Sequence, residues 1–228
     1  MSDNATGRDS QIYEQVFDAL LEQKLAPGTH LSEDKLGQVF GVSRTIIRKV
    51  LQRLAHEGVV EIHRNRGANI AHTSPTQVTQ AFAARQAIEA AVIESACQHI
   101  KAKQLKHLQS IIDDEQLARQ ELDHGRALRL SGEWHLLLAE YCGNEFLAGF
   151  ARSLISRCSL IIAQYEVADS KLCPQDEHSE ILTAIAAGDC TRAKALMAQH
   201  IQHIAAKIDI TPTQAQPDLA QIFSSTKD

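Results

Sequence analysis

The sequence has few aromatic residues, no paired-cysteine motif and no long apolar run. Phe, Trp and Tyr make up only 4% of the 228 residues. The five cysteines are an odd number and no two form a Cys-x-x-Cys pair, which favours a reducing cytoplasm over a disulfide framework or a zinc ribbon. The longest apolar runs cover four residues, far below the ~18 of a membrane span. The polar N-terminus lacks a signal-peptide pattern. We therefore expect a cytoplasmic protein with no membrane partner.

Charge is distributed unevenly along the chain. The formal net charge is −5, from 23 Lys/Arg and 28 Asp/Glu, which is an unusual balance for a protein that binds nucleic acid. Residues 1–72 nevertheless carry nine basic and nine acidic residues, and residues 44–66 hold six Lys/Arg against Glu57 and Glu61. A basic segment inside an acidic chain is more informative than the average, and it indicates contact with a polyanion.

The N-terminal 73 residues begin with three predicted helices. An apolar helical pattern runs through 12–21 after an N-cap at Ser10, and a short helix capped by Ser32 follows. Ser43 is placed to cap the third helix, residues 44–56, which separates an apolar face from a polar, basic one.

A hairpin is predicted to follow the third helix. Residues 59–63 and 68–71 are short β-branched runs, and the polar turn between them has Gly67 where a positive φ is needed. Three helices and a hairpin predict a winged helix-turn-helix domain over 1–73, whose third helix is presented to DNA.

The remainder of the chain shows helical periodicity and no strand pattern. Short connections between helices imply antiparallel neighbours, so we predict an all-α helical bundle over 74–210 and a mobile tail over 211–228. The fold class is therefore mainly α, with an N-terminal winged helix-turn-helix followed by an antiparallel all-α bundle. The six helices of the bundle are expected at about 76–99, 101–124, 126–142, 144–168, 175–187 and 189–208.

The N-terminal motif resembles the DNA-binding domain of GntR-type bacterial regulators. The run that carries the resemblance is Leu36-x-x-x-Phe40-Gly41-Val42-Ser43-Arg44-Thr45-x-x-Arg48-x-x-Leu51-x-x-Leu54-x-x-x-Gly58-Val59-Val60, then Asn65-Arg66-Gly67-Ala68. The helical remainder resembles the FCD-like ligand-binding domain of the FadR subfamily. The resemblance implies a homodimeric transcriptional regulator, expected to be a repressor, that binds a palindromic double-stranded DNA operator. By the resemblance, Arg44 and Arg48 would read bases, and Ser43 and Thr45 would contact phosphates. The wing tip would be formed by the 63–67 turn, with His63, Arg64, Arg66 and Gly67. Lys49 adds a further cation to the exposed face of the recognition helix.

Base and phosphate contacts are expected from different cations on the recognition helix. Arg48 lies in the middle of its polar face, where Arg can bond guanine bidentately, while Lys49 and Arg53 are placed for phosphate. The helix departs from the family pattern at two positions. Ile46 stands where these proteins often have Pro, and Lys49 where they often have Glu, so the operator sequence cannot be copied from relatives.

Three histidines are candidate metal ligands in the bundle. His135, His178 and His200 lie on different predicted helices between apolar residues, and three converging imidazoles would bind Zn²⁺, Ni²⁺ or Mn²⁺. The alternative is a metal-free polar pocket lined by the same side chains. In the metal-binding FadR-like proteins that the chain resembles, an Asp precedes the first His by four residues. Ser131 occupies that position here, which predicts a weaker or different site.

Two further residues match effector-site positions of the FadR subfamily. By that resemblance, Arg85 would face the effector cavity and pair with a carboxylate effector, although Glu89 at i+4 offers it an intrahelical partner instead. Asn144 matches a second position, and a helix-cap role explains it equally well. The resemblance therefore implies a small organic acid as effector.

Two other functions compete with a transcription regulator. One is a metal-dependent enzyme that uses the three histidines and carries an accessory DNA domain. The sequence has no His-Glu-x-x-His, Gly-x-Ser-x-Gly or phosphate-loop motif, so we expect no enzyme. The other is an architectural DNA protein, which would need no polar pocket inside a bundle.

Overall fold

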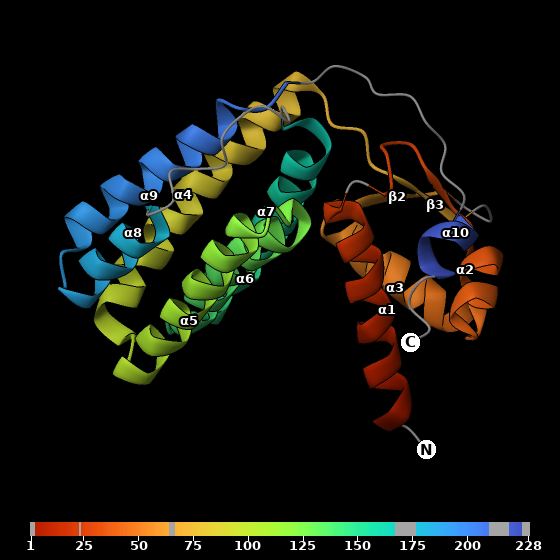
Figure 1. Cartoon of the computed structure of the whole chain (residues 1–228), viewed down its shortest axis with the longest axis horizontal. Helices are drawn as coiled ribbons and strands as arrows, with labels where there is room; N and C mark the ends of the chain where they lie inside the picture. Colours follow the sequence, from red (N-terminus) through yellow and green to blue (C-terminus); the bar gives the residue numbers. More distant parts are fainter. Residues whose placement is uncertain (1–2, 23, 64–66, 167–176, 210–218, 225–228) are drawn as a thin grey trace. The chain divides into compact units, whose positions relative to one another are not determined.

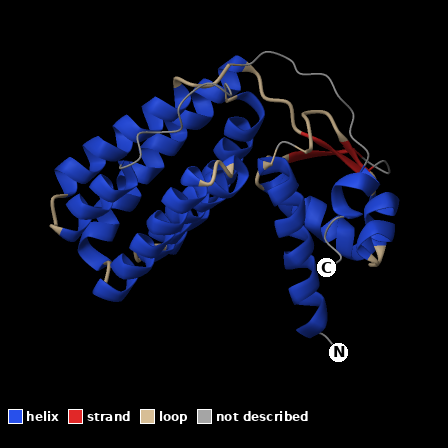
Figure 2. Ribbon diagram, in the orientation of Figure 1, coloured by secondary structure: helices blue, strands red, loops and turns tan. Residues whose placement is uncertain are grey.

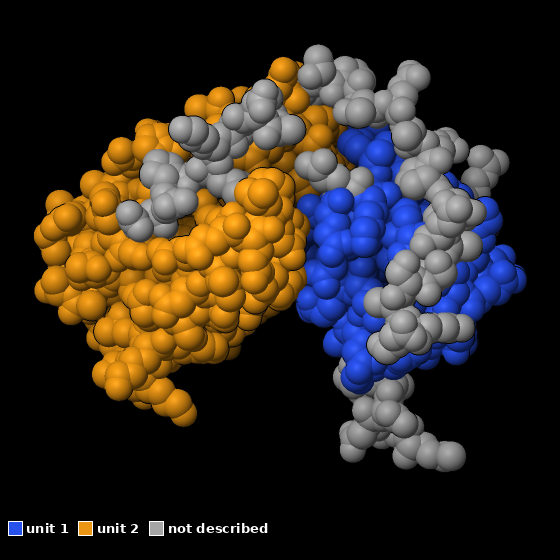
Figure 3. Space-filling view, in the orientation of Figure 1, with its two compact units in different colours: residues 1–72, 211–228 blue, residues 73–210 orange. Residues whose placement is uncertain are grey.

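The computed structural model describes residues 3–22, 24–63, 67–166, 177–209 and 219–224. The chain divides into two compact units, which are coloured separately in Figure 3. The DNA-binding unit comprises residues 1–72 with 211–228, and the helical unit comprises residues 73–210. The three strands that the structure describes all belong to the DNA-binding unit (Figure 2).

The DNA-binding unit begins with three helices, α1 (Asp3–Leu21), α2 (Glu33–Phe40) and α3 (Arg44–His56). The predicted cap of α2 is confirmed, because the Ser32 side chain accepts a hydrogen bond from the Lys35 backbone amide. The predicted start of α1 at Ser10 is wrong, since the helix begins at Asp3. Its first two turns are polar, and a method that follows apolar periodicity does not detect them.

A small antiparallel sheet completes the winged motif. Its strands are β1 (His30–Leu31), β2 (Val60–His63) and β3 (Gly67–Ile70), in the order β1-β3-β2. The predicted hairpin is confirmed, whereas β1 was not predicted because two residues are too few to show a strand pattern. Gly67 has a φ of +86°, and a Cβ at this position would collide with the Leu31 carbonyl oxygen. Glycine is therefore required there both by φ and by the closeness of β1.

A short C-terminal helix, α10 (Leu219–Ser224), belongs to the DNA-binding unit and packs on α2. The Phe223 ring lies 5.2 Å from the Phe40 ring between centroids, and Leu219 is buried. This helix falls within the segment predicted as a tail. The rest of that segment, 211–218 and 225–228, lies outside the described residues.

The described residues of the helical unit form six helices in the predicted order. Figure 1 shows α9 running alongside α4, and α6 alongside α5. Asn144 caps α7 by accepting from two backbone amides, and Asp189 caps α9. The core is apolar and includes Trp134, which has no exposed surface. The helices are α4 (Pro75–His99), α5 (Ala102–Gln120), α6 (His124–Tyr141), α7 (Glu145–Tyr165), α8 (Glu177–Ala186) and α9 (Cys190–Ala205).

Helix α7 is long and apolar enough, by length and composition alone, to cross a membrane. Counting uninterrupted apolar runs missed this property because Ser, Gly and Arg residues interrupt the helix. Half of its most apolar 18-residue window is buried, and the helix packs against α4 and α6. The core helix of a soluble bundle meets the same criterion, so this single helix is weak evidence for a membrane span.

Candidate functional site

The recognition helix α3 presents its predicted DNA face to solvent. Ser43, Arg44, Thr45, Arg48 and Lys49 are all exposed, while the opposite face is buried. Ser43 occupies the N-cap position, but its side chain makes no capping hydrogen bond. Its hydroxyl can therefore donate to a phosphate, which is the role expected for it.

Acidic residues of α2 pair with the two arginines that are expected to read bases. Arg48 donates to both carboxylate oxygens of Glu33, from Nε at 3.0 Å and from Nη2 at 2.7 Å. Arg44 forms an ion pair with Asp34. The exposed fractions of the Arg44 and Arg48 side chains are 69% and 60%, and ion pairs so accessible to water stabilise by at most about 1 kcal/mol. DNA can displace these pairs at small cost.

Arg53 is exposed and also makes contacts within the unit. Its guanidinium lies 3.6 Å from the centroid of the Tyr13 ring and 3.5 Å from a Glu57 carboxylate oxygen. The Tyr13 hydroxyl donates to the same carboxylate at 2.5 Å. These contacts join α3 to α1, and the phosphate contact expected for Arg53 stays a prediction.

The wing is described only in part. His63 is exposed at the end of β2, and Gly67 is buried at the start of β3. Arg64 and Arg66, the predicted wing-tip contacts, lie outside the described residues. On the adjacent edge, His30 Nδ1 and the Asn69 side-chain oxygen lie 2.8 Å apart, which joins β1 to β3.

In the helical unit, the structure brings together the three histidines that were singled out in the sequence. His135 on α6, His178 on α8 and His200 on α9 are each at most 5% exposed. Their Nε2 atoms lie 3.2 Å apart for His135–His200 and His178–His200, and 3.3 Å apart for His135–His178. Three imidazole nitrogens therefore face one common point inside the bundle.

The Nδ1 atom of each imidazole, on the ring side away from the cluster centre, lies within hydrogen-bond distance of a carboxylate. His135 Nδ1 lies 2.5 Å from Glu89, His178 Nδ1 lies 2.8 Å from Glu115, and His200 Nδ1 lies 2.7 Å from Glu177. A carboxylate that accepts the Nδ1–H fixes the ring and leaves Nε2 with its lone pair. Metal-binding histidines usually have such a partner.

The three carboxylates are ionised in this arrangement. Burial opposes ionisation, but the charge and hydrogen bond of His178, then those of Arg119, lower the pKa of Glu115 to about 2. Burial likewise opposes ionisation of Glu177, whose pKa is brought to about 2 by hydrogen bonds from His200 and His203. The pKa of Glu89 is lowered further by His135 and Arg85 against the effect of burial. An ionised carboxylate only accepts hydrogen bonds, so each Nδ1 is the donor.

Two of the imidazoles, those of His135 and His200, are neutral at pH 7. Burial lowers the pKa of His135 to about 3, with Arg85 and His178 contributing and Glu89 opposing. Burial and the neighbouring His178 lower the pKa of His200 to about 4. With Nδ1 donating, the Nε2 lone pairs of His135 and His200 face each other at 3.2 Å. A cation among the three nitrogens would relieve the repulsion between these lone pairs.

The spacing of the three nitrogens fits a small divalent metal. Ligands at the usual Zn–N distance of about 2.0–2.1 Å and at tetrahedral angles lie about 3.3 Å from one another, while adjacent octahedral ligands lie about 2.9–3.0 Å apart. The observed 3.2–3.3 Å separations agree with the tetrahedral case. Trp134 supports the rings, because it stacks on His178 and meets His135 edge-on.

The residue at the position of the missing carboxylate lies beside a small cavity. Ser131, one turn before His135, lines a cavity of about 30 Å³ together with Arg119, Glu166 and apolar side chains. This volume suits about one water molecule. Glu133, two residues from His135, pairs instead with Arg129.

The two predicted effector-contacting residues are placed differently from each other. Arg85 is 2% exposed and donates from Nε to Glu89 at 2.5 Å, which is the intrahelical alternative considered for it. Since Glu89 also holds His135, the guanidinium lies next to the histidine cluster. Asn144 acts as the N-cap of α7 and accepts from the Phe146 and Leu147 amides at 3.1 Å.

Sequence reasoning did not identify the carboxylates of the cluster. Glu89 was considered only as a partner of Arg85, while Glu115 and Glu177 were not singled out. Glu177 directly precedes His178 but holds His200, on the next helix. No sequence spacing shows such a pairing, because it depends on how α8 and α9 are rotated against each other.

Comparisons with known proteins agree with both units. Residues 8–70 match the family model of the bacterial regulatory proteins of the gntR family, and residues 80–203 match that of the FCD domain. The chain is 27% identical over 205 residues to the HTH-type transcriptional repressor RspR of Escherichia coli K12, covering 88% of each protein. It is 27% identical over 217 residues to the Uxu operon regulator of Haemophilus influenzae, covering 83% of this chain and 79% of that regulator.

Solved structures share the fold. McbR/YncC of E. coli superposes with a TM-score of 0.77 at 18% identity, covering 87% of this chain and 95% of that one. A structural-genomics protein described as a GntR regulator, from Rhodococcus sp. RHA1, gives a TM-score of 0.72 at 21% identity over 88% and 96% of the two chains. The family models and named relatives describe transcription regulators, so the alternative of a metal-dependent enzyme is not retained. The chain belongs to the GntR family of bacterial transcription regulators and carries an FCD domain as its helical unit.

Proposed function

We propose that this protein is a cytoplasmic, homodimeric repressor whose affinity for a palindromic operator is controlled by a small organic acid bound at a divalent metal in the helical unit. The convergence of the three Nε2 atoms within 3.3 Å, each imidazole held by an ionised carboxylate, carries this proposal. Its relative RspR is named as a repressor, which supports the same direction of control.

The charge balance of the cluster supports an anionic effector. Glu89, Glu115 and Glu177 contribute three negative charges, and Arg85 and Arg119 contribute two positive ones. These five side chains alone carry a net charge of −1. A divalent metal changes that to +1, and one carboxylate then restores neutrality in a region where an unbalanced charge is costly.

The chain supplies three metal ligands and leaves further positions for an effector. His135, His178 and His200 would hold the ion, and the metal would supply a Lewis-acid site for a carboxylate oxygen. Ser131 offers a neutral hydroxyl where relatives of the metal-binding kind have an acid, so it adds no charge that competes with an anionic effector. The cavity beside Ser131 admits about one water. Side chains that move when an organic acid binds would give binding a means to favour one conformation.

Metal content of three proteins tests the site directly. Wild type, His178→Ala and His107→Ala would be stripped with chelator, titrated with Zn²⁺, Ni²⁺ and Mn²⁺, and analysed by calorimetry and mass spectrometry. His107 is an exposed histidine that contacts Tyr141 outside the cluster, so His107→Ala is the matched control. We expect His178→Ala to lose affinity by at least 100-fold, because only two nitrogens remain. Equal metal content in wild type and His178→Ala would exclude the three-histidine ion.

Effector control is tested on DNA. A duplex selected from a random library serves as operator, and fluorescence anisotropy measures its affinity with and without a panel of mono- and dicarboxylic acids. We expect at least one acid to weaken operator binding by wild type. His178→Ala should keep operator affinity without acid and lose the response, because the DNA-binding unit is unchanged. A response that survives in His178→Ala would separate effector binding from the metal.

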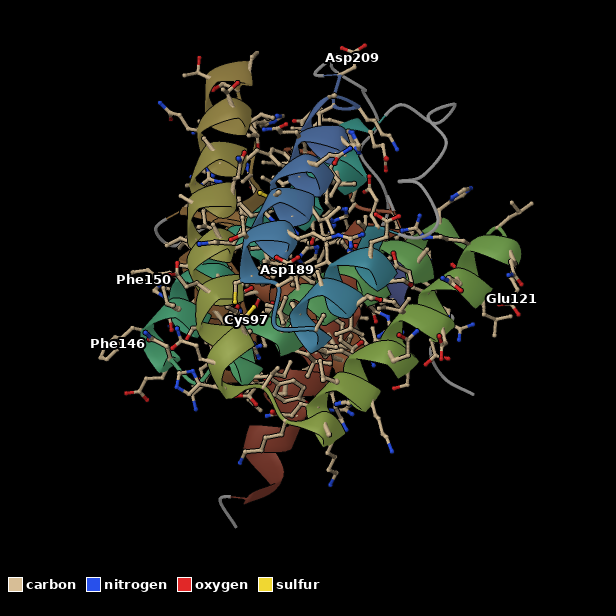
Figure 4. The ribbon with its side chains drawn as sticks, turned by 90° about the vertical axis from the view of Figure 1, so that its left-hand side faces the viewer. Cys97, Glu121, Phe146, Phe150, Asp189 and Asp209 are labelled. Atoms are coloured by element: carbon tan, nitrogen blue, oxygen red, sulfur yellow. The ribbon has the colours of Figure 1, made fainter. Side chains whose placement is uncertain are left out.

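The dimer requires a surface, and α7 provides a candidate. Phe146 and Phe150 are 74% and 62% exposed and lie one turn apart, with exposed Gly149 between them, and both project outward in Figure 4. Two-fold packing of α7 against a second copy would bury four phenylalanines across the glycines. Phe150→Glu should therefore reduce the mass measured by light scattering from about twice to once the 25.1 kDa chain mass. Leu117→Glu, at a 44% exposed leucine of α5, should leave the mass unchanged, and an unchanged mass in both variants would place the interface elsewhere.

A further inference from the structure

Two cysteines from neighbouring helices of the helical unit lie against each other. Cys97 is on the last turns of α4 and Cys190 is the first residue of α9. The Cys190 thiol is close enough to Cys97 to raise the pKa of Cys97, and both residues are partly exposed. Figure 4 shows Cys97 next to Asp189, the residue before Cys190. The pair lies outside the histidine cluster and has no part in the proposed function.

The surrounding contacts hold the two helices close at this end. Lys194 on α9 donates to Glu94 on α4 at 3.2 Å, one turn along each helix from the cysteines. Ala96 and Ala193 beside them are completely buried. Small side chains permit a close approach of helix backbones, and a short separation between backbones is what a disulfide needs.

The two thiols differ in their readiness to react. Burial, then the hydrogen bond and charge of Cys190, raise the pKa of Cys97 to about 12. Cys97 therefore remains a thiol and can donate its S–H to Cys190. Cys190, the other thiol of the pair and the first residue of α9, is therefore assigned as the thiol that reacts first.

We propose that Cys97 and Cys190 form a reversible disulfide when the protein meets a peroxide. The Cys190 thiolate attacks one peroxide oxygen, the O–O bond breaks, and the leaving oxygen takes up a proton to give water. The sulfenic acid formed on Cys190 is then attacked by the Cys97 sulfur, which loses its proton. The displaced hydroxide combines with that proton as a second water. Two thiols lose two hydrogens and two electrons, and one hydrogen peroxide is reduced to two waters.

The remaining described cysteines are poor competitors. Cys142 and Cys158 have no exposed surface, and burial, with opposing effects from Arg85 and Glu89, raises the pKa of Cys158 to about 11. Buried thiols of this kind are inert toward oxidants. Cys173 lies outside the described residues, so it is treated as a competitor in the experiment.

A crosslink at this place would fix two helices that carry parts of the histidine cluster. At 1.5 Å per residue, Cys97 lies about 12 Å along α4 from Glu89, and Cys190 lies about 15 Å along α9 from His200. The disulfide would close a long loop through α5, α6, α7 and α8, and long loops give the largest restriction of the unfolded chain. Oxidation should therefore raise the melting temperature of the helical unit.

Peptide mapping of the full-length protein tests the proposal. Reduced wild type is exposed to hydrogen peroxide, free thiols are alkylated, and a non-reducing digest is analysed by mass spectrometry. We expect a Cys97–Cys190 peptide as the main crosslink, loss of two free thiols per chain, and a melting temperature higher by on the order of 5–10 °C that dithiothreitol reverses. Cys173→Ser should behave as wild type.

Two serine variants separate the roles of the sulfurs. Cys97→Ser should accumulate a sulfenic acid on Cys190 that dimedone traps, because the second sulfur is missing. Cys190→Ser should leave Cys97 unmodified at the same peroxide dose. A crosslink that contains Cys173, or no Cys97–Cys190 peptide at a dose that consumes two thiols, would overturn the proposal. Dimedone labelling of Cys97 in preference to Cys190 would overturn the assigned order of attack.

Discussion

Mild acid should destabilise the metal-free protein because of two buried imidazoles. His135 and His200 have pKa values of about 3 and about 4 in the folded protein, against about 6.5 in an unfolded chain. Between these values the unfolded chain binds protons that the folded protein does not bind. Stability therefore falls as pH falls below 6.5, and it continues to fall until the folded-state pKa values are reached.

The size of the effect follows from proton linkage. For one histidine that titrates near pH 6.5 only in the unfolded state, lowering the pH from 7 to 5.5 removes about 1.2 kcal/mol of unfolding free energy. His135 and His200 together should remove about 2.5 kcal/mol. The carboxylates Glu115 and Glu177 also have lowered pKa values, but their unfolded-state pKa lies near 4.5, so they add almost nothing above pH 5.5.

The assay is urea unfolding of chelated protein, followed by circular dichroism at pH 7 and at pH 5.5. Wild type should lose about 2.5 kcal/mol, whereas His200→Gln should lose about half as much, because one titrating imidazole is gone. Exposed His107→Gln serves as the control and should show the wild-type dependence. Equal pH dependence in wild type and His200→Gln would refute the reasoning, since it would mean that the cluster imidazoles titrate normally.

Three further substitutions have defined outcomes. Glu33→Gln removes the ion-pair partner that Arg48 must leave when it contacts DNA. Operator affinity measured by anisotropy should therefore rise by about 1.5- to 5-fold. A decrease in affinity would show instead that the ion pair orients Arg48 for binding. Ser131→Asp should tighten zinc binding in calorimetry by adding an anionic ligand one turn before the first histidine, and unchanged affinity would place residue 131 out of reach of the ion. Gly67→Ala should destabilise the DNA-binding unit by about 1–3 kcal/mol in urea because of its positive φ and the closeness of Leu31, whereas wild-type stability would show that β1 can move aside.

Local signals in the sequence predicted most of the fold. The six bundle helices could be placed in order because apolar periodicity and caps such as Asn144 and Asp189 act within one or two turns. The wing could be predicted for the same reason, since Gly67 and its flanking strands are adjacent in the chain. What lacked a local signal was missed, including β1, which consists of two residues, and the polar first turns of α1.

The site could be predicted only in part. The three histidines could be selected because they lie between apolar residues, and their order matched a family pattern. Their convergence depends on the rotation of α6, α8 and α9, which a sequence does not show. The pairing of Glu177 with His200 and that of Glu33 with Arg48 likewise join residues far apart in the chain. Such pairs follow from tertiary packing, so they cannot be predicted by physical reasoning from one sequence.

The docking of α10 on α2 makes the helical unit an insertion within the DNA-binding unit. The chain leaves the DNA-binding unit before α4 and re-enters it after α9, so the two units are joined by two covalent connections instead of one. Leu219 and Phe223 are the buried side chains that dock α10. Burial of two such side chains stabilises the docked state by roughly 3–6 kcal/mol before chain entropy is subtracted. The stability of the DNA-binding unit therefore depends in part on residues that follow the helical unit in the chain.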